Sequence, residues 1–154
     1  MSLLELLEKV EMFKDLTFPE VNKIGALCKE TSFKPGDIII EEGEPGEALY
    51  IIKSGKARIV KMEGDQERKL AEAGEGEHLG EMSLLDDATT SARVAAEEPT
   101  ECLVLYKEDL DQLLETDDKL HVKILRAVIR TLTQRLRRTS TDLMLLKMDF
   151  AEDQ

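Results

Sequence analysis

The sequence has few cysteines and histidines, the side chains that form disulfides and bind zinc. Its 154 residues include two cysteines, two histidines and no tryptophan. Cys28 and Cys102 each lie within an apolar run, which is typical of small buried side chains rather than of a disulfide or metal pair. His78 and His121 are isolated from each other in the sequence. We therefore expect no metal site and no cofactor, and the unpaired thiols indicate a reducing, cytoplasmic location.

Positive charge and long apolar runs are also scarce. The chain has 21 Lys and Arg against 33 Asp and Glu, a formal net charge of −12, which argues against nucleic acid or an anionic membrane as a partner. Eight of the basic residues lie between Lys119 and Lys147, a stretch with one acid, Asp142, which is typical of a solvated helix face. No apolar run is long enough to cross a bilayer, and no serine or cysteine has a local base. We expect no direct nucleic-acid binding, no membrane contact and no enzymatic activity.

The spacing of apolar residues changes twice along the chain. Before residue 30 it is helical on both sides of Pro19, which predicts two short amphipathic helices. From Ser32 to Tyr106 the chain consists of short segments that are rich in β-branched residues or alternate apolar with polar residues. Turns that contain glycine, such as Pro35-Gly36 and Ser54-Gly55, separate these segments. Short strands at this spacing predict a small antiparallel sandwich or barrel.

After Tyr106 the pattern is helical and contains a heptad seam. The seam residues recur at alternating spacings of three and four, with one polar member: Val122, Leu125, Ile129, Leu132, Leu136, Thr139, Leu143 and Leu146. A helix this long exceeds what a small barrel can cover, so the seam predicts a homodimer through this helix. The alternative is a helix packed wholly on its own barrel. We divide the chain into residues 1–116, the helices and barrel, and residues 117–154, the long helix and tail.

The segment from Gly80 to Val94 carries a resemblance to a known family. It reads Gly80-Glu81-Met82-Ser83-Leu84-Leu85, then Thr89-Thr90-Ser91-Ala92-Arg93-Val94, and it follows hairpin segments at 33–43 and 48–55. Together these segments resemble the cyclic nucleotide-binding domains found in catabolite activator proteins and in regulatory subunits of protein kinase A. The resemblance covers almost the whole chain. It implies a mainly β fold, an antiparallel β-roll of the jelly-roll type with N-terminal helices and a long C-terminal helix.

The resemblance also implies a ligand site, with cyclic AMP or cyclic GMP as the candidate ligand. In that family Glu81 would accept a hydrogen bond from the ribose 2′-hydroxyl, and Gly80 would allow close approach. The amides of Met82, Ser83 and Leu84 would open a helical turn whose N-terminus faces the phosphate. The alternative is that Glu81 is an acid stabilised by the dipole at a helix N-terminus, but the surrounding match favours the ligand role.

The long helix holds a second group of candidate ligand residues. In that family an arginine of the long helix approaches the glutamate that Glu81 matches, and Arg135 resembles this arginine. Thr139 and Ser140 resemble a Thr-Ser pair, one residue from each subunit, that contacts the adenine amino group. A lone Thr139 in a heptad seam also fits a polar residue that sets the register of a coiled coil, and both interpretations stay open.

Position 90 departs from the family pattern. The family has an arginine nine or ten residues after Glu81, where this chain has Thr90 followed by Ser91. A threonine hydroxyl cannot replace the charge-assisted contact to a phosphate, a loss of about 1.5–3 kcal/mol or about one to two decades of affinity. Arg93 is a candidate substitute if the loop slips, although the ungapped match to the next strand disfavours slippage. We therefore predict weak binding of cyclic nucleotides or none.

Three functions are consistent with these residues. In the first, the domain senses a cyclic nucleotide and signals through a dimer of its C-terminal helix to an unknown effector protein. In the second, the site is degenerate and the protein is a ligand-independent dimeric adaptor. In the third, it is the sensor half of a transcription regulator whose DNA-binding part is lost or supplied by another chain, a hypothesis that rests on analogy with the family alone.

Overall fold

The computed structural model describes residues 1–81, 84–85 and 88–152 of the chain. Its N-terminal part forms α1 (Leu3–Glu8), a 3-10 turn η1 (Glu11–Phe13) and α2 (Phe18–Gly25). A capping box begins α2: the Thr17 hydroxyl accepts from the Glu20 amide, and the Glu20 carboxylate accepts from the Thr17 amide at 2.9 Å. The predicted helix start beside Pro19 is therefore confirmed.

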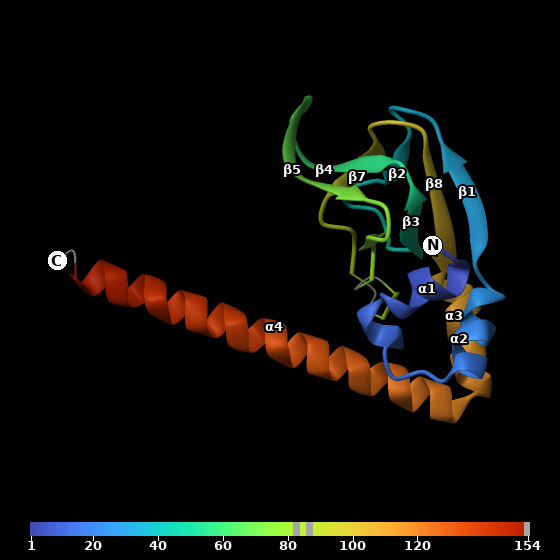
Figure 1. Cartoon of the computed structure of the whole chain (residues 1–154). Coiled ribbons are helices and arrows are strands. Elements are labelled where there is room, and N and C mark those ends of the chain that lie inside the picture. The colour runs from blue at the N-terminus through green and yellow to red at the C-terminus, as the bar shows by residue number, and fades with distance from the viewer. Residues whose placement is uncertain (82–83, 86–87, 153–154) are drawn as a thin grey trace.

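The middle of the chain folds into a roll of two four-stranded antiparallel sheets (Figure 1). The first sheet has the order β1-β8-β3-β6 and the second β2-β7-β4-β5, which confirms the predicted antiparallel β-roll. The short β6 was not predicted from the sequence. The strand bounds are β1 (Lys29–Phe33), β2 (Ile38–Ile40), β3 (Ala48–Ser54), β4 (Lys56–Glu63), β5 (Gln66–Gly74), β6 (His78–Leu79), β7 (Arg93–Ala96) and β8 (Thr100–Tyr106).

Two apolar clusters hold the roll and its helices together. One lies inside the roll and includes Ile52, Val94 and Val104, which are nearly fully buried. The other joins the first sheet to the helices, and it includes Phe13 of η1 and Leu105 of β8. Side chains of one strand, β3, contribute to both clusters because successive residues point to opposite faces. The helices are thus fixed to the sheet that carries β6.

The two cysteines are free and lie within the protein, as the sequence predicted. Cys102 is 1% exposed, and Cys28 is partly buried. Burial raises the pKa of each thiol to about 11, so both remain protonated and unreactive at neutral pH.

The C-terminal part consists of α3 (Lys107–Thr116) and α4 (Asp118–Glu152). Only the first turns of α4 contribute buried side chains, at Leu120, Ile124 and Ala127. The rest of α4 runs past one end of the roll and away from it (Figure 1). Seam residues remain exposed, with Ile129 at 61% and Leu136 at 67%. The helix is therefore not packed wholly on its own roll, which removes that alternative.

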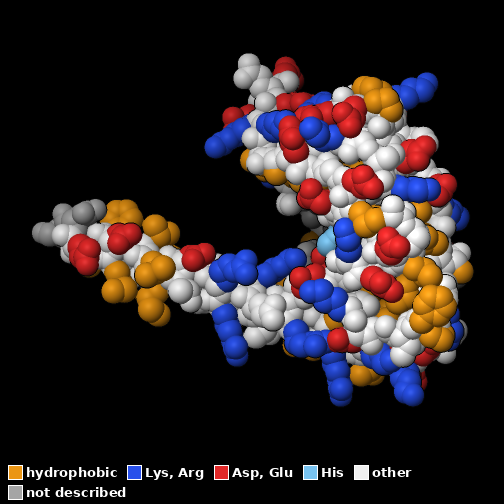
Figure 2. Space-filling view, in the orientation of Figure 1, with side chains coloured by type: hydrophobic (Ala, Val, Ile, Leu, Met, Phe, Trp, Pro, Cys, Tyr) orange, Lys and Arg blue, Asp and Glu red, His pale blue; other side chains and the backbone are white. Residues whose placement is uncertain are grey.

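The exposed part of α4 has two chemically different halves (Figure 2). Arginine and lysine side chains gather on its inner half, and hydrophobic side chains gather near its outer end. The exposed apolar residues of the outer end are Leu143, Met144, Leu145, Leu146, Met148 and Phe150. Exposed apolar surfaces of this kind are typical of sites that contact another molecule.

The turn between β3 and β4 depends on Gly55. Its φ is +97°, and a Cβ built there would lie 2.5 Å from the carbonyl oxygen of Pro99 and 2.6 Å from the hydroxyl of Thr100. Gly64, in the turn between β4 and β5, also has a positive φ of +65°, but a Cβ there would meet no atom within 4 Å. A side chain at Gly64 would therefore cause backbone strain alone, whereas a side chain at Gly55 would cause both strain and steric overlap.

We predict that Gly55→Ala lowers the free energy of unfolding by about 3–4 kcal/mol, because strain and overlap add. Gly64→Ala, the matched control, should lose only about 1–2 kcal/mol from strain. Urea unfolding of both variants at one protein concentration measures the difference. Equal losses would show that the turn at Gly55 relaxes freely.

Candidate functional site

The candidate site is built on the turn that follows β6. His78 and Leu79 pair with Ile51 and Tyr50 of β3 in antiparallel register. Gly80 then turns the chain with a φ of +86°, and a Cβ there would lie 2.7 Å from the carbonyl oxygen of Ala48. Position 80 therefore accepts only glycine, because the turn passes directly over the backbone of β3.

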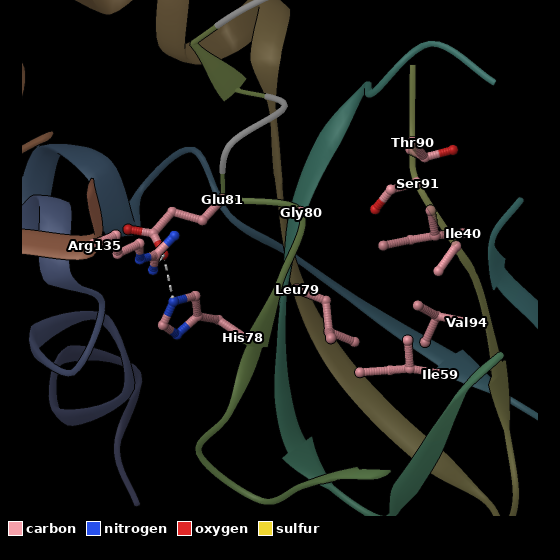
Figure 3. Close-up of a pocket in the computed structure, with 11 residues that line it drawn as sticks. Ile40, Ile59, His78, Leu79, Gly80, Glu81, Thr90, Ser91, Val94 and Arg135 are labelled. Carbon is pink, nitrogen blue, oxygen red and sulfur yellow. Dashed lines mark hydrogen bonds and ion pairs between the residues drawn. The ribbon is translucent and has the colours of Figure 1, made fainter. Parts of the chain in front are cut away.

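Beside this turn lies a cavity of about 340 Å³ (Figure 3). Its size falls within the range of about 300–1,000 Å³ that small-molecule sites occupy. The second sheet and β6 supply an apolar side, and the turn, the 90–92 segment and α4 supply polar groups. The lining residues are Ile40, Ile59, His78, Leu79, Gly80, Glu81, Thr90, Ser91, Ala92, Val94 and Arg135.

Glu81 is the most buried charged group that lines this cavity, with 11% of its side chain exposed. Its Oε2 atom lies 2.8 Å from Nε2 of His78, three residues earlier. The guanidinium of Arg135, from α4, lies 3.9 Å from the same oxygen. The structure thus brings the predicted residues Glu81 and Arg135 together across more than fifty residues of sequence.

Thr90 lines the cavity, but its hydroxyl is used elsewhere. The hydroxyl donates to the carbonyl oxygen of Glu41, and its side chain points away from the apolar lining (Figure 3). The Thr90 amide donates to the Glu44 carbonyl at 2.9 Å, and the Thr90 carbonyl accepts from the Gly43 amide at 2.9 Å. The segment is therefore fixed to the turn at 41–44 without a cationic side chain at position 90.

Ser91, the next predicted residue, also lines the cavity. Its backbone carbonyl accepts a hydrogen bond of 2.8 Å from Nζ of Lys61 on β4. Lys61 is held in turn by an ion pair of 2.6 Å with Glu42. Lys61 therefore fixes the 90–92 segment from outside the cavity.

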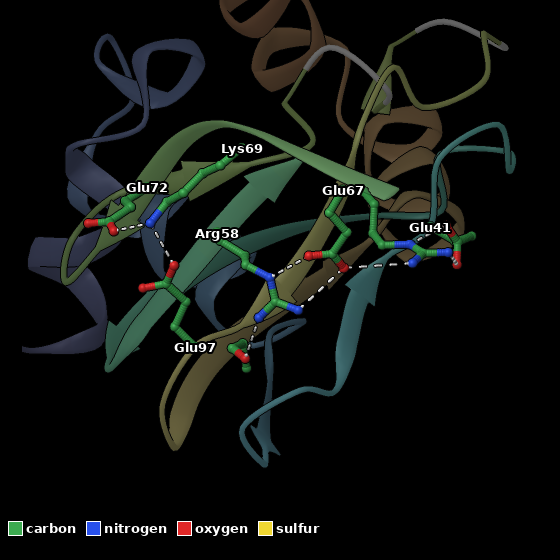
Figure 4. Close-up of polar contacts among 8 residues, drawn as sticks. Glu41, Arg58, Glu67, Lys69, Glu72 and Glu97 are labelled. Carbon is green, nitrogen blue, oxygen red and sulfur yellow. Dashed lines mark hydrogen bonds and ion pairs between the residues drawn. The ribbon is translucent and has the colours of Figure 1, made fainter. Parts of the chain in front are cut away.

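Arg93 does not reach the cavity. Its guanidinium forms a two-bond ion pair with Glu41, at 2.8 Å and 3.1 Å, and lies 3.9 Å from Glu67. The Arg93 hydrogen bond holds the pKa of the Glu41 carboxyl below its ordinary value. Figure 4 shows the surrounding network on the outer face of the second sheet, where Arg58 pairs with Glu67. Arg93 is the first residue of β7, so the slipped register that would make it a phosphate contact is wrong.

The remaining predicted residues lie apart from the cavity or outside the described structure. Thr139 and Ser140 are exposed on α4, and the Thr139 hydroxyl donates to the Arg135 carbonyl at 2.9 Å. Within one chain they do not line the cavity. Met82 and Ser83 lie outside the described residues.

Sequence reasoning missed His78 and the apolar lining of the cavity. Ile40, Ile59 and Val94 were read only as strand residues, because period-two alternation gives the face of a strand but not what lies opposite. His78 was considered only as an isolated histidine. Its signal was the spacing to Glu81, which places both side chains on one side of the Gly80 turn (Figure 3).

Other kinds of site find no support in the described part of the chain. Over residues 1–81, 84–85 and 88–152, no group of three or more His, Cys, Asp or Glu side chains could hold a metal ion. Among the same residues, no helix combines the length and apolar character needed to span a bilayer.

Comparison with known sequences identifies relatives over most of the chain. A cyclic AMP receptor protein from Thermus thermophilus is 36% identical over 143 residues, which cover 92% of this chain and 64% of that protein. A cGMP-dependent protein kinase from Eimeria tenella is 41% identical over 110 residues, which cover 71% of this chain. The chain spans only 11% of the kinase's length.

Solved structures share the fold. The N-terminal domain of a transcriptional regulator from Streptomyces coelicolor superposes with a TM-score of 0.76 and 31% identity, covering 87% of this chain and 94% of that one. The regulatory subunit of a cAMP-independent protein kinase A from Trypanosoma brucei superposes with a TM-score of 0.66 and 27% identity, covering 84% of this chain and 46% of that one. A variant of that subunit with three substitutions, one of them threonine to arginine, is bound to cAMP in its A site.

The family model for the cyclic nucleotide-binding domain matches residues 30–117, which is more than half of the chain. The matched region runs from β1 to the end of α3 and contains the Gly80 turn and position 90. On this match, the sequence relatives and the shared roll, the chain belongs to the cyclic nucleotide-binding domain family.

Proposed function

We propose that this chain is a regulatory domain that binds cyclic AMP or cyclic GMP weakly in the cavity beside Gly80. The observation that carries the proposal is the meeting of Glu81, on the turn after β6, with Arg135 of α4 at one cavity. The Glu81 carboxylate would accept a hydrogen bond from a ribose hydroxyl, and the apolar side chains would contact the base. A ligand at this junction touches both the roll and the long helix, so its binding energy can favour one placement of α4.

The second part of the proposal is a homodimer through α4, acting on an effector protein. Support comes from the seam, whose apolar members from Val122 to Leu146 are exposed in the single chain. In a parallel pair, Thr139 and Ser140 of each α4 would lie close to the partner helix, where they would contact the base of the ligand. The free thiols at Cys28 and Cys102 fit a cytoplasmic protein.

A second candidate function is a ligand-independent dimeric adaptor. It is favoured by position 90, where the Thr90 hydroxyl donates to the Glu41 carbonyl and offers no charge to a phosphate. The trypanosome relative with this fold belongs to a kinase that is cAMP-independent. A third candidate, the sensor half of a transcription regulator, is supported by the Thermus and Streptomyces relatives.

We predict that Thr90→Arg strengthens cyclic AMP binding by about tenfold to a hundredfold, because it supplies a charge-assisted contact to the phosphate. A trypanosome variant that is bound to cAMP carries a threonine-to-arginine substitution among its three changes. Isothermal titration with cyclic AMP and cyclic GMP measures both affinities. Thr89→Arg is the matched control, because Thr89 is exposed, pairs with Pro45 and does not line the cavity.

The control should change affinity less than threefold if the effect depends on a contact rather than on net charge. If neither the wild type nor Thr90→Arg binds either nucleotide while both remain folded, the sensor proposal fails. The adaptor function then becomes the better account.

We predict that replacing Ile129 and Leu132 with glutamate converts a micromolar dimer into a monomer, because two charges would be buried in the seam without partners. Sedimentation velocity measures the change. The control carries Arg137→Glu and Thr141→Glu, two exposed positions outside the seam, and should remain dimeric. A wild-type chain that is already monomeric at these concentrations would contradict the dimer proposal.

A further inference from the structure

The surroundings of the cavity beside Gly80 are acidic. In the described part of the chain, Arg135 is the one lysine or arginine that lines this cavity, and its guanidinium lies 3.9 Å from the Glu81 carboxylate. The segment from Leu70 to Ala92, which contains the Gly80 turn, has no lysine or arginine. It has six acids, Glu72, Glu75, Glu77, Glu81, Asp86 and Asp87.

The cationic side chains next to the 90–94 segment are paired outside the cavity. Arg93 bonds the Glu41 carboxylate at 2.8 Å and 3.1 Å. Lys61 forms an ion pair of 2.6 Å with Glu42, and neither Lys61 nor Arg93 lines the cavity. Among the described residues, a phosphate seated there would therefore find Arg135 as its one cationic neighbour of these types, and Arg135 already contacts a carboxylate.

A second cavity, of about 200 Å³, adjoins the first and shares three of its lining residues. The carboxylates of Glu44 and Glu47 lie in its lining, and both residues are exposed. Glu41 also lines it, but the charge of Glu41 is balanced by Arg93. Like charges repel, so these carboxylates disfavour an anion in the adjoining space.

The same cavity offers good contacts to the uncharged parts of a nucleoside. His78 and Arg135 both lie at the Oε2 atom of Glu81, which leaves Oε1 able to accept a hydrogen bond. A nucleoside has free hydroxyls at both C2′ and C3′ of its ribose, whereas a 3′,5′-cyclic nucleotide keeps only the 2′-hydroxyl. Apolar surface for a base lies on the side of the cavity away from Glu81, at Ile59, Leu79 and Val94 (Figure 3).

We propose that the acidic surroundings of this cavity select an uncharged nucleoside over a cyclic nucleotide. The proposal rests on the proposed function, because it keeps a ribose hydroxyl at Glu81 and the base on the apolar side. It differs in the phosphate, which adds a negative charge beside the carboxylates of Glu81, Glu44 and Glu47. A nucleoside makes the same favourable contacts without that repulsion.

The test is isothermal titration of the wild-type chain at low ionic strength with adenosine, cyclic AMP and the uncharged methyl ester of cyclic AMP. The ester keeps nearly the shape of cyclic AMP and lacks its charge, so it is the matched control ligand. We expect adenosine to bind about tenfold to hundredfold more tightly than cyclic AMP. The ester should also bind about tenfold more tightly than cyclic AMP, because it carries no charge.

A double variant tests the carboxylates of the adjoining cavity. Glu44→Gln with Glu47→Gln should strengthen cyclic AMP binding about twofold to fivefold and leave adenosine binding unchanged. The matched control is Glu75→Gln with Glu98→Gln, because Glu75 and Glu98 are exposed and line neither cavity. The control should leave the ratio of the two affinities unchanged.

Cyclic AMP that binds the wild type as tightly as adenosine would overturn the nucleoside proposal and leave the proposed function standing. An ester that binds no more tightly than cyclic AMP would also overturn it, because shape and not charge would then set the preference. If adenosine binds but no cyclic nucleotide binds even to Thr90→Arg, the nucleoside proposal holds and the cyclic nucleotide function fails. Binding of neither kind of ligand to either chain overturns both.

Discussion

The burial of the first turns of α4 fixes the geometry on which the site depends. Leu120, Ile124 and Ala127 are the buried residues of that helix, and the first two belong to the apolar cluster that also contains Phe13 and Leu105. This contact sets the direction in which the helix leaves the roll. Because the helix is rigid, the same direction carries Arg135, about three turns later, to the Glu81 carboxylate. The packing of the first turns of α4 therefore allows the Gly80 turn and the later part of α4 to form one site.

Much of the fold could be predicted from the sequence, because strand alternation, glycine turns and the heptad seam are local patterns. The exposed Ile129 and Leu136 show that these seam residues do not pack on the core of this chain. The two-residue β6 could not be predicted, since His78 and Leu79 form a strand only by pairing with β3. The prediction for Gly80 was also incomplete, because its close approach to the Ala48 carbonyl is a contact between segments that are distant in the sequence.

The charged groups at the cavity are not arranged as they would be in a simple anion-binding site. The arginine of the 90–94 segment, Arg93, is used on the outer face in an ion pair with Glu41, and Thr90 is bonded to the turn at 41–44. The Arg135 guanidinium and the His78 imidazole, which also line the cavity, lie against the Glu81 carboxylate instead. Glu81 and Arg135 meet through contacts between segments that are distant in the sequence, so the sequence alone could not show that arrangement.

We propose that a cyclic nucleotide occupies the cavity between the Gly80 turn and α4. The most direct measurement is a ¹H–¹⁵N NMR titration of the wild-type chain with cyclic AMP and cyclic GMP at millimolar concentration, where weak ligands still populate their site. If the ligand occupies this cavity, we expect amide shifts at Gly80, Glu81 and Ser91 that continue into α4 around Arg135. Shifts confined to other surfaces, or none with either nucleotide, would contradict it.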